Sequence, residues 1–275
     1  MKLEKSSKTI ITLYAIICAF WIFLFIVSKY ALIDSQLLET IQHFTQIPLV
    51  ILPLVGGIIG LKNSLLWSGV KSVVGRSSMA LSLGLIAWAG GMIIWNYYLF
   101  FTNNEVPYPS LADIVFILSW PLWTYGIWKL SEAIGVKFAF RKISNIFFVV
   151  PSLIIFISVY LLMYVARSGI TYENPFKLFF DLFYPLGDIV ILTVTASVYL
   201  LLRKFLGGIY KVPVLILFFG FLLNYFSDFL FSYTTTQGTY FNGHIVDFLF
   251  TTTMFVLSLG LSMLSPSILD SRIED

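Results

Sequence analysis

The sequence predicts an all-α membrane protein, a single bundle of about eight transmembrane helices. Of its 275 residues, 59% are hydrophobic and only 11% are charged, whereas a soluble domain carries about 25% charged residues. A chain with so few polar side chains cannot cover a water-exposed surface, so we expect the lipid bilayer to be its solvent. A spanning helix needs about 20 apolar residues. The segments that approach or exceed this length are 9–31, 45–61, 77–101, 111–131, 143–165, 178–202, 212–233 and 245–264.

The first apolar segment follows Lys2, Lys5 and Lys8, so it has the charge pattern of a signal peptide. It runs for about 23 residues and lacks an Ala-x-Ala cleavage site, whereas the apolar part of a signal peptide has about 7–15 residues. We therefore expect it to remain as the first membrane helix. The single cysteine, Cys18, lies inside it and excludes a disulfide within the chain.

Prolines and glycines mark the helices that we expect to be irregular. The second segment is the shortest, and it contains two prolines and a Gly56-x-x-x-Gly60 spacing typical of closely packed membrane helices. Pro121, Pro151 and Pro185 lie in the fourth, fifth and sixth segments. They are expected to kink these helices, which would allow a cavity to open between them.

The distribution of positive residues predicts the orientation of the chain. With the N-terminus inside, 14 of the 17 Lys and Arg residues fall in inner loops or termini and 3 on the outer side, as the positive-inside rule requires. The bias holds in every loop, which favours eight helices with both termini in the cytoplasm and a multi-pass protein of the cell membrane. The net charge of +3 follows from this topology and indicates no nucleic-acid partner.

The connections between the expected helices are short, and the tail after Pro266 has nine residues. We find no nucleophile elbow, phosphate-cradling loop or paired Cys/His cluster. We therefore expect no enzyme activity and no catalytic residues, and the sequence indicates no particular cofactor. Any signal should arise within the helices or pass to a separate membrane or cytoplasmic protein partner.

Short similarities between helices favour a repeated helical hairpin. Leu-Ala-Asp-Ile-Val-Phe at 111–116 resembles Leu-Gly-Asp-Ile-Val-Ile at 186–191, and 244–249 is a looser match. The third and seventh segments share an Asn-Tyr-aromatic triplet, at 96–98 and 224–226. Coincidence is the alternative, because chance matches are common in sequences this rich in Leu, Ile and Phe.

Five aspartates fall within or at the ends of the expected helices: Asp113, Asp181, Asp188, Asp228 and Asp247. An Asp at the centre of a membrane helix costs about 2.5–3.5 kcal/mol, so such residues are usually paired and functional. Three of the five lie within one turn of an outer helix end. At about 1.5 Å per residue, Asp228 lies about 8 Å deep and Asp188 about 15 Å deep.

The three shallow aspartates have a structural interpretation. Asp113 and Asp247 lie in the first turns of their helices, where a carboxylate satisfies free backbone N–H groups and interacts favourably with the helix dipole. Asp181 is expected to be solvated at the interface. His244 precedes Asp247 by three residues and so shares its helix face. A metal site would need more nitrogen or sulfur ligands, and His43 is the only other histidine, so no metal site is predicted.

Asp188 and Asp228 are too deep to be helix caps, so each needs a buried partner. The candidates are amides, tyrosine hydroxyls, His244 and water. Asn96 and Asn224 lie at comparable depth, whereas no Lys or Arg does. We expect these groups to converge in an outward-facing polar cavity, because polar groups in lipid pair with one another or with water. The candidate ligand-binding residues are Asp188, Asp228, Asn96, Asn224, Asp247 and His244.

Several of these motifs together resemble a known membrane region. They are Pro-Tyr-Pro-Ser-Leu-Ala-Asp at 107–113, Phe-Tyr-Pro-Leu-Gly-Asp at 183–188, Asp-Phe-Leu-Phe-Ser-Tyr at 228–233 and Gly-Thr-Tyr at 238–240. The set is similar to the multi-helix membrane sensor region found N-terminal to bacterial GGDEF and EAL cyclic-di-GMP enzymes and some histidine kinases. The similarity covers helices three to eight, about 170 residues, and it implies a sensory input module.

The similarity does not extend to a cytoplasmic output domain, and we expect none after the last helix. A sensory role would therefore require a separate partner. We expect a membrane-embedded sensory or ligand-binding module that signals through such a partner. The alternatives are an accessory subunit that stabilises a larger membrane complex and a proton-linked transporter that uses Asp188 and Asp228.

Overall fold

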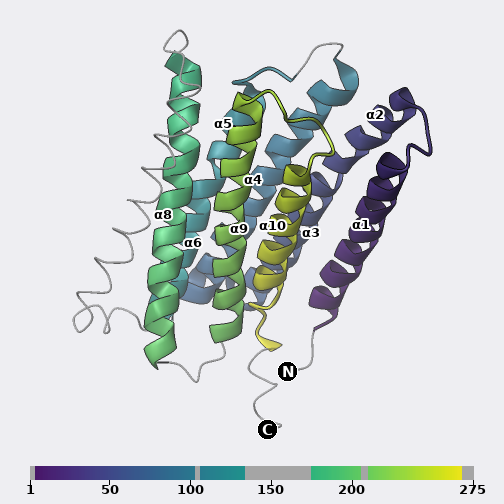
Figure 1. Ribbon diagram of the computed structural model, residues 1–275. Coiled ribbons are helices and arrows are strands. Elements are labelled where there is room, and N and C mark those ends of the chain that lie inside the picture. Colours follow the sequence, from purple (N-terminus) through teal and green to yellow (C-terminus); the bar gives the residue numbers. More distant parts are fainter. Residues whose placement is uncertain (1–3, 103–105, 134–174, 206–209, 268–275) are drawn as a thin grey trace.

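The computed structural model describes residues 4–102, 106–133, 175–205 and 210–267, and throughout these ranges the regular structure is helical (Figure 1). The elements are α1 (Lys5–Lys29), α2 (Ser35–His43), the 3₁₀ turn η1 (Phe44–Gln46), α3 (Pro48–Leu66), the 3₁₀ turn η2 (Gly69–Lys71), α4 (Val73–Phe101), α5 (Leu111–Ile117), α6 (Ser119–Ala133), α8 (Pro175–Phe205), α9 (Lys211–Thr236) and α10 (Ile245–Ser262).

Six helical stretches of the described chain are long and apolar enough to cross a membrane, which confirms a multi-pass, all-α membrane protein. They are Lys5–Lys29, Ser35–Leu66, Val73–Phe101, Leu111–Ala133, Lys211–Thr235 and Ile245–Ser262. Within α8, a shorter apolar stretch covers Leu186–Leu200. The expected helix at 143–165 lies outside the described residues. Eight spans and a repeated hairpin therefore stay predictions.

Two of the expected helices differ from the structure, each for a local reason. The second begins ten residues earlier than expected, at Ser35, because the Asp34 side chain caps α2 by accepting a hydrogen bond from the Leu37 N–H at 2.9 Å. The fourth is divided at Leu118 into α5 and α6. Pro121, in the first turn of α6, has no N–H to donate to the preceding turn, and its ring clashes with that turn's carbonyl. The helix break predicted near Pro121 is therefore present, whereas α8 runs as one helix from Pro175 to Phe205 through Pro185, and Pro151 lies outside the described residues.

The helices pack as a closed ring in the order α3, α4, α6, α8, α9 and α10, with α1 outside against α3 and α10. Small residues bring α3 and α10 close together: a Cβ atom at Gly56 would lie 2.1 Å from Ser258 Oγ, and one at Gly60 would lie 2.4 Å from Leu261 Cδ2. The predicted close packing at these two glycines is therefore confirmed. Ser258 Oγ also donates to the Leu52 carbonyl at 3.1 Å.

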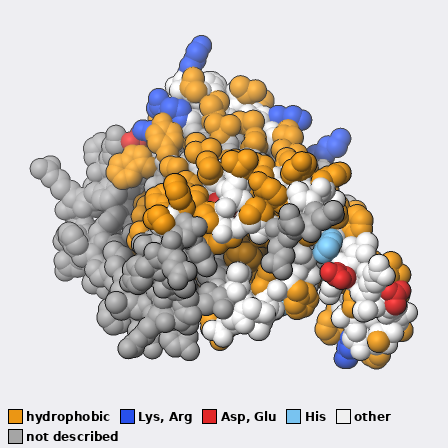
Figure 2. Space-filling model, turned by 90° about the horizontal axis from the view of Figure 1, so that it is seen from above, with side chains coloured by type: hydrophobic (Ala, Val, Ile, Leu, Met, Phe, Trp, Pro, Cys, Tyr) orange, Lys and Arg blue, Asp and Glu red, His pale blue; other side chains and the backbone are white. Residues whose placement is uncertain are grey.

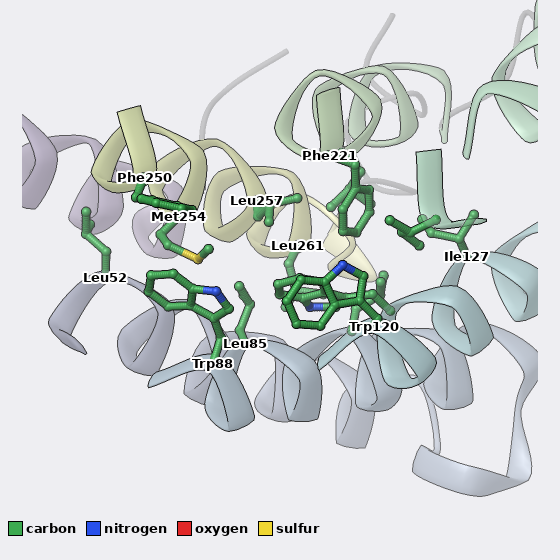
Figure 3. Close-up of a cluster of buried hydrophobic side chains, with 14 of the residues drawn as sticks. Leu52, Leu85, Trp88, Trp120, Ile127, Phe221, Phe250, Met254, Leu257 and Leu261 are labelled. Carbon is green, nitrogen blue, oxygen red and sulfur yellow. The ribbon is translucent and has the colours of Figure 1, made fainter. Parts of the chain in front are cut away.

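Large apolar side chains fill the centre of the ring (Figure 3). Trp88 of α4 lies 5.9 Å from the ring of Phe250 of α10, and Trp123 of α6 lies 5.5 Å from the ring of Phe221 of α9. Met254, at the middle of α10, is completely buried between them. This core holds α6, α9 and α10 in a fixed rotation about their axes.

α1 begins and α10 ends at the same end of the bundle, at the bottom of Figure 1. We call the opposite end, where α9 ends and α10 begins, the distal end. Seen from that end, hydrophobic side chains gather over part of the described surface, with backbone and other side chains between them (Figure 2). The aspartates singled out above lie in the distal half of the bundle.

Candidate ligand-binding site

Asp188 of α8 meets Asn224 and Asp228 of α9 in the distal half of the bundle. Asn224 and Asp228 are four residues apart, so their side chains lie on the same helix face. Asn224 Nδ2 donates one hydrogen bond to Asp188 Oδ1 at 2.9 Å and another to Asp228 Oδ2 at 2.7 Å. An amide nitrogen has two hydrogens, so this single group joins both carboxyls. We call the three residues the deep carboxyl site.

Trp120 of α6 adds a third helix to the deep carboxyl site. Its Nε1 donates to Asp188 Oδ1 at 2.9 Å, the same oxygen that accepts from Asn224. Gly187 permits this approach, because a Cβ atom there would lie 2.5 Å from Trp120 Cδ1. The ring of Tyr184, one turn earlier on α8, packs against the indole with centroids 5.2 Å apart.

The deep carboxyl site is mostly buried, and none of the described Lys, Arg or His side chains forms an ion pair with its carboxyls. Asp188 is 1% exposed and Asn224 is fully buried, whereas Asp228 is partly exposed. The two carboxyls lie side by side, because both accept a hydrogen bond from the same Asn224 nitrogen. The one ion pair found in the described part of the chain, Lys129–Glu132, lies within α6 and involves neither aspartate. Burying charge without a partner is costly, so this site is electrostatically incomplete.

One polar atom of the deep carboxyl site has no partner. Asn224 Oδ1 is buried and accepts no hydrogen bond. Buried polar atoms are rarely left in this condition. Both hydrogens of the Asn224 amide nitrogen are therefore bonded to the carboxyls, whereas its oxygen accepts no hydrogen bond.

Asp113 caps α5, as predicted. Its carboxylate accepts from the Ser110 backbone N–H at 2.6 Å, while the Ser110 hydroxyl accepts from the Ala112 N–H at 3.1 Å. The other carboxylate oxygen accepts from the Tyr184 hydroxyl at 2.6 Å. Asp113 thereby connects the start of α5 to α8, close to the deep carboxyl site.

Asp247 lies in the first turn of α10 and is 2% exposed. Its Oδ2 accepts from Gln46 Nε2 at 2.8 Å and from the Gly243 N–H at 2.7 Å, and its Oδ1 accepts from the Tyr240 hydroxyl at 2.9 Å. Three donors from two segments bind both oxygens, and we call a carboxylate saturated when each of its oxygens accepts at least one hydrogen bond. Burial, together with the neighbouring Asp247 carboxylate, raises the pKa of Tyr240 well above its usual value.

The predicted ligand-binding residues thus form two groups. Asp188, Asn224 and Asp228 converge as expected, but Asn96 does not join them: its Nδ2 donates to the Met92 carbonyl at 2.8 Å and to the Gln46 carbonyl at 3.4 Å. Gln46 in turn contacts Asp247. His244 begins α10 as its N-cap, with Nδ1 accepting from the Val246 N–H at 3.3 Å. A ligand-binding role for any of these residues stays a prediction, and the Asp181 side chain lies outside the described part.

Sequence reasoning missed four partners of the aspartates: Trp120, Gln46, Tyr184 and Tyr240. Three of them did carry a signal. Trp120-Pro and Tyr184-Pro are recurring aromatic–proline pairs, and Tyr240 belongs to the Gly-Thr-Tyr loop motif. Gln46 carried none, because it lay at the edge of an apolar segment.

Among the described residues, no group of three or more His, Cys, Asp and Glu side chains is arranged to hold a metal ion. Comparisons of the chain with protein-family models, curated proteins and solved structures found no match. The deep carboxyl site must therefore be interpreted from its own chemistry.

Proposed function

We propose that the protein is a membrane-embedded sensory or ligand-binding module and that the deep carboxyl site receives its stimulus. One observation carries this proposal: a single amide nitrogen holds two carboxyls, that of the buried Asp188 and that of the partly exposed Asp228, and no described cation neutralises them. Such a site attracts a positively charged or hydrogen-bond-donating species. The partly exposed Asp228 supplies its access.

The contacts of the site suggest how occupancy would be transmitted. Asp188 Oδ1 accepts from both Trp120 of α6 and Asn224 of α9. A species that competes for this oxygen weakens the links between three neighbouring helices. A stimulus shifts a conformational equilibrium only through different contacts in its two states, and these bonds provide that difference. A separate membrane or cytoplasmic protein would detect the resulting helix movement.

In this proposal, the distal end faces outward and both termini are cytoplasmic, in the cell membrane. The support is the excess of Lys and Arg in the loops assigned to the cytoplasm. The test uses a Cys18→Ala background and a membrane-impermeant maleimide. We expect Gln237→Cys to be labelled in intact cells and Val70→Cys only after permeabilisation, since both positions are exposed at opposite ends. The reverse pattern would place the site on the cytoplasmic side.

Partner capture tests the sensory role. Full-length wild type, Asp188→Asn and Asp228→Asn are cross-linked in their native membranes and purified, with Asp34→Asn as the matched control. The control is exposed and caps α2, a role that Asn fills as well as Asp. We expect both site variants, but not the control, to change the amount of partner captured at unchanged melting temperature. Equal capture by all four proteins would contradict the proposal and favour an accessory subunit.

A further inference from the structure

We infer that Asp188, Asn224 and Asp228 form a proton-binding site, in which the carboxyls share one proton and the Asn224 amide turns over when a second one binds. This inference rests on the proposed function, because it names the species that the deep carboxyl site receives.

The first proton follows from the contact between the carboxyls. An ionised carboxylate only accepts hydrogen bonds, whereas a protonated carboxyl also donates one. Asp188 Oδ1 and Asp228 Oδ2 accept hydrogen bonds from the same nitrogen, at 2.9 and 2.7 Å, so the two carboxyls lie side by side around one amide group. Sharing one proton between them is therefore favourable. Two like charges at this separation cannot both ionise at low cost, as paired aspartates in other proteins show. One shared proton removes that repulsion.

The second proton follows from the unpartnered Asn224 Oδ1. With one proton on the pair, the amide is best placed with Nδ2 toward the carboxyls, as observed. With two protons, the pair gains a second O–H donor and needs an acceptor. A half-turn of the amide plane presents Oδ1 to the carboxyls without changing the volume that the side chain occupies. The atom that lacks a partner here is the acceptor that a doubly protonated pair requires.

The other polar groups around the pair have hydrogen-bond partners of their own. From α5, Asp113 is held by its capping bonds and by the hydroxyl of Tyr184 of α8. From α6, the contact is Trp120, which does not titrate. On the other side of α9, the capping aspartate of α10 is bound to its own three donors. Within the described chain, no Lys, Arg or His contacts either carboxyl of the pair.

Access distinguishes the two carboxyls. Asp188 is 1% exposed, whereas Asp228 is partly exposed and lies eight residues from the distal end of α9. Protons therefore enter at Asp228 and reach Asp188 through the shared hydrogen bond. Because Asp188 also accepts from Trp120, protonation at the surface reaches α6 through one continuous set of contacts.

Infrared titration of the full-length protein in bilayer nanodiscs tests the inference by following the C=O band of protonated carboxyls against pH. We expect two proton-binding steps from the pair in wild type and in Asp34→Asn. Asp188→Asn and Asp228→Asn should each show one step, which coincides with neither wild-type step because interacting groups titrate as a unit. Asn224→Leu, which removes the bridge, should move both steps, with melting temperature reporting that each variant is folded.

Several outcomes would overturn the inference. The carboxyls are independent if each Asn variant loses one step and leaves the other in place. A band that moves when NaCl replaces choline chloride at fixed pH would identify a metal-ion site instead. The infrared titration and the partner capture can fail independently. If the titration shows two coupled steps but partner capture is unchanged in the variants, the site binds protons without a sensory role. Altered capture without coupled steps leaves a sensory site for another species.

Discussion

Asp247 and Asp188 are both almost completely buried, yet their surroundings are opposite in kind. Asp247 accepts three hydrogen bonds distributed over both oxygens. Asp188 receives two on a single oxygen, and one of those donors is shared with Asp228. The difference arises from position in the helix, since a first-turn carboxylate meets free backbone N–H groups, whereas one in mid-helix depends on side chains. We expect a saturated carboxylate to be part of the scaffold and an undersupplied one to respond to a bound species.

Asp113 shows that saturation at helix starts is a recurring solution. Like Asp247, it is the third residue of its helix, accepts a backbone N–H near the N-cap, and accepts a tyrosine hydroxyl from another segment. Both carboxylates thus fix a helix start and connect it to a neighbour. The deep carboxyl site has no comparable backbone donor.

Removing the saturated carboxylate should have the largest effect on stability. Asp247→Ala strands Gln46 Nε2, which is 1% exposed, together with the Tyr240 hydroxyl and the Gly243 N–H. Leaving a buried donor unpaired costs about 1–3 kcal/mol, so we expect a loss of about 3 kcal/mol or more in chemical unfolding. Glu39→Ala is the control, because Glu39 is exposed on α2. A loss no greater than that of the control would show that Asp247 is no more structural than a surface carboxylate.

The sequence predicts which segments span the membrane and how deep each aspartate lies, but it does not predict which helices become neighbours. Hydropathy predicts the described spans, since each is a long apolar run, and depth separates the capping Asp113 and Asp247 from the deeper Asp188. Depth alone misplaces Asn96, because α4 packs between α3 and α6 in the ring rather than beside α8 or α9. Trp120 is missed because its direction depends on the break at Leu118. The depth of a residue follows from its position along its helix, which the sequence gives. The neighbours of that helix and its rotation about its own axis are set by tertiary packing.

Disturbing the third helix of the deep carboxyl site should have a smaller effect. Gly187→Ala places a methyl group 2.5 Å from Trp120 Cδ1 and forces the indole away from Asp188. Overpacking costs about 1–3 kcal/mol, more than the roughly 1 kcal/mol gained in helix propensity. The matched control is Gly90→Ala, whose methyl group would meet only Val115 Cγ1 at 3.3 Å. Unfolding curves should separate the two variants, and equal stability would mean that α6 approaches α8 less closely than described.

Tyr240, which donates to the saturated Asp247, should make the unfolding free energy depend on alkaline pH, and the deep carboxyl site should not. Burial and the adjacent Asp247 carboxylate raise the pKa of Tyr240, so the native phenol keeps its proton where an unfolded one loses it. This stabilisation is complete below about pH 10, the unfolded pKa, and declines as pH rises above it. Tyr240→Phe should cost about 1 kcal/mol at neutral pH and should flatten the alkaline decline in unfolding free energy. The exposed Tyr233→Phe is the control, and parallel curves for wild type and Tyr240→Phe would contradict the effect.

The smallest effect is expected at Asp188, the residue that differs most from Asp247 in its surroundings. Both of its donors bind Oδ1, so in Asp188→Asn the amide oxygen accepts the same two bonds and the new N–H₂ group gains Asp228 as an acceptor. The substitution also removes one buried negative charge. We therefore expect the unfolding free energy to change by less than about 0.5 kcal/mol, the usual range of a substitution that breaks no essential contact. In Asp247→Asn the same chemical change puts an N–H₂ group where an oxygen had accepted, so it should cost more. Equal losses at the two positions would erase the distinction between a saturated and an undersupplied carboxylate, and Asp188 would then be as structural as Asp247.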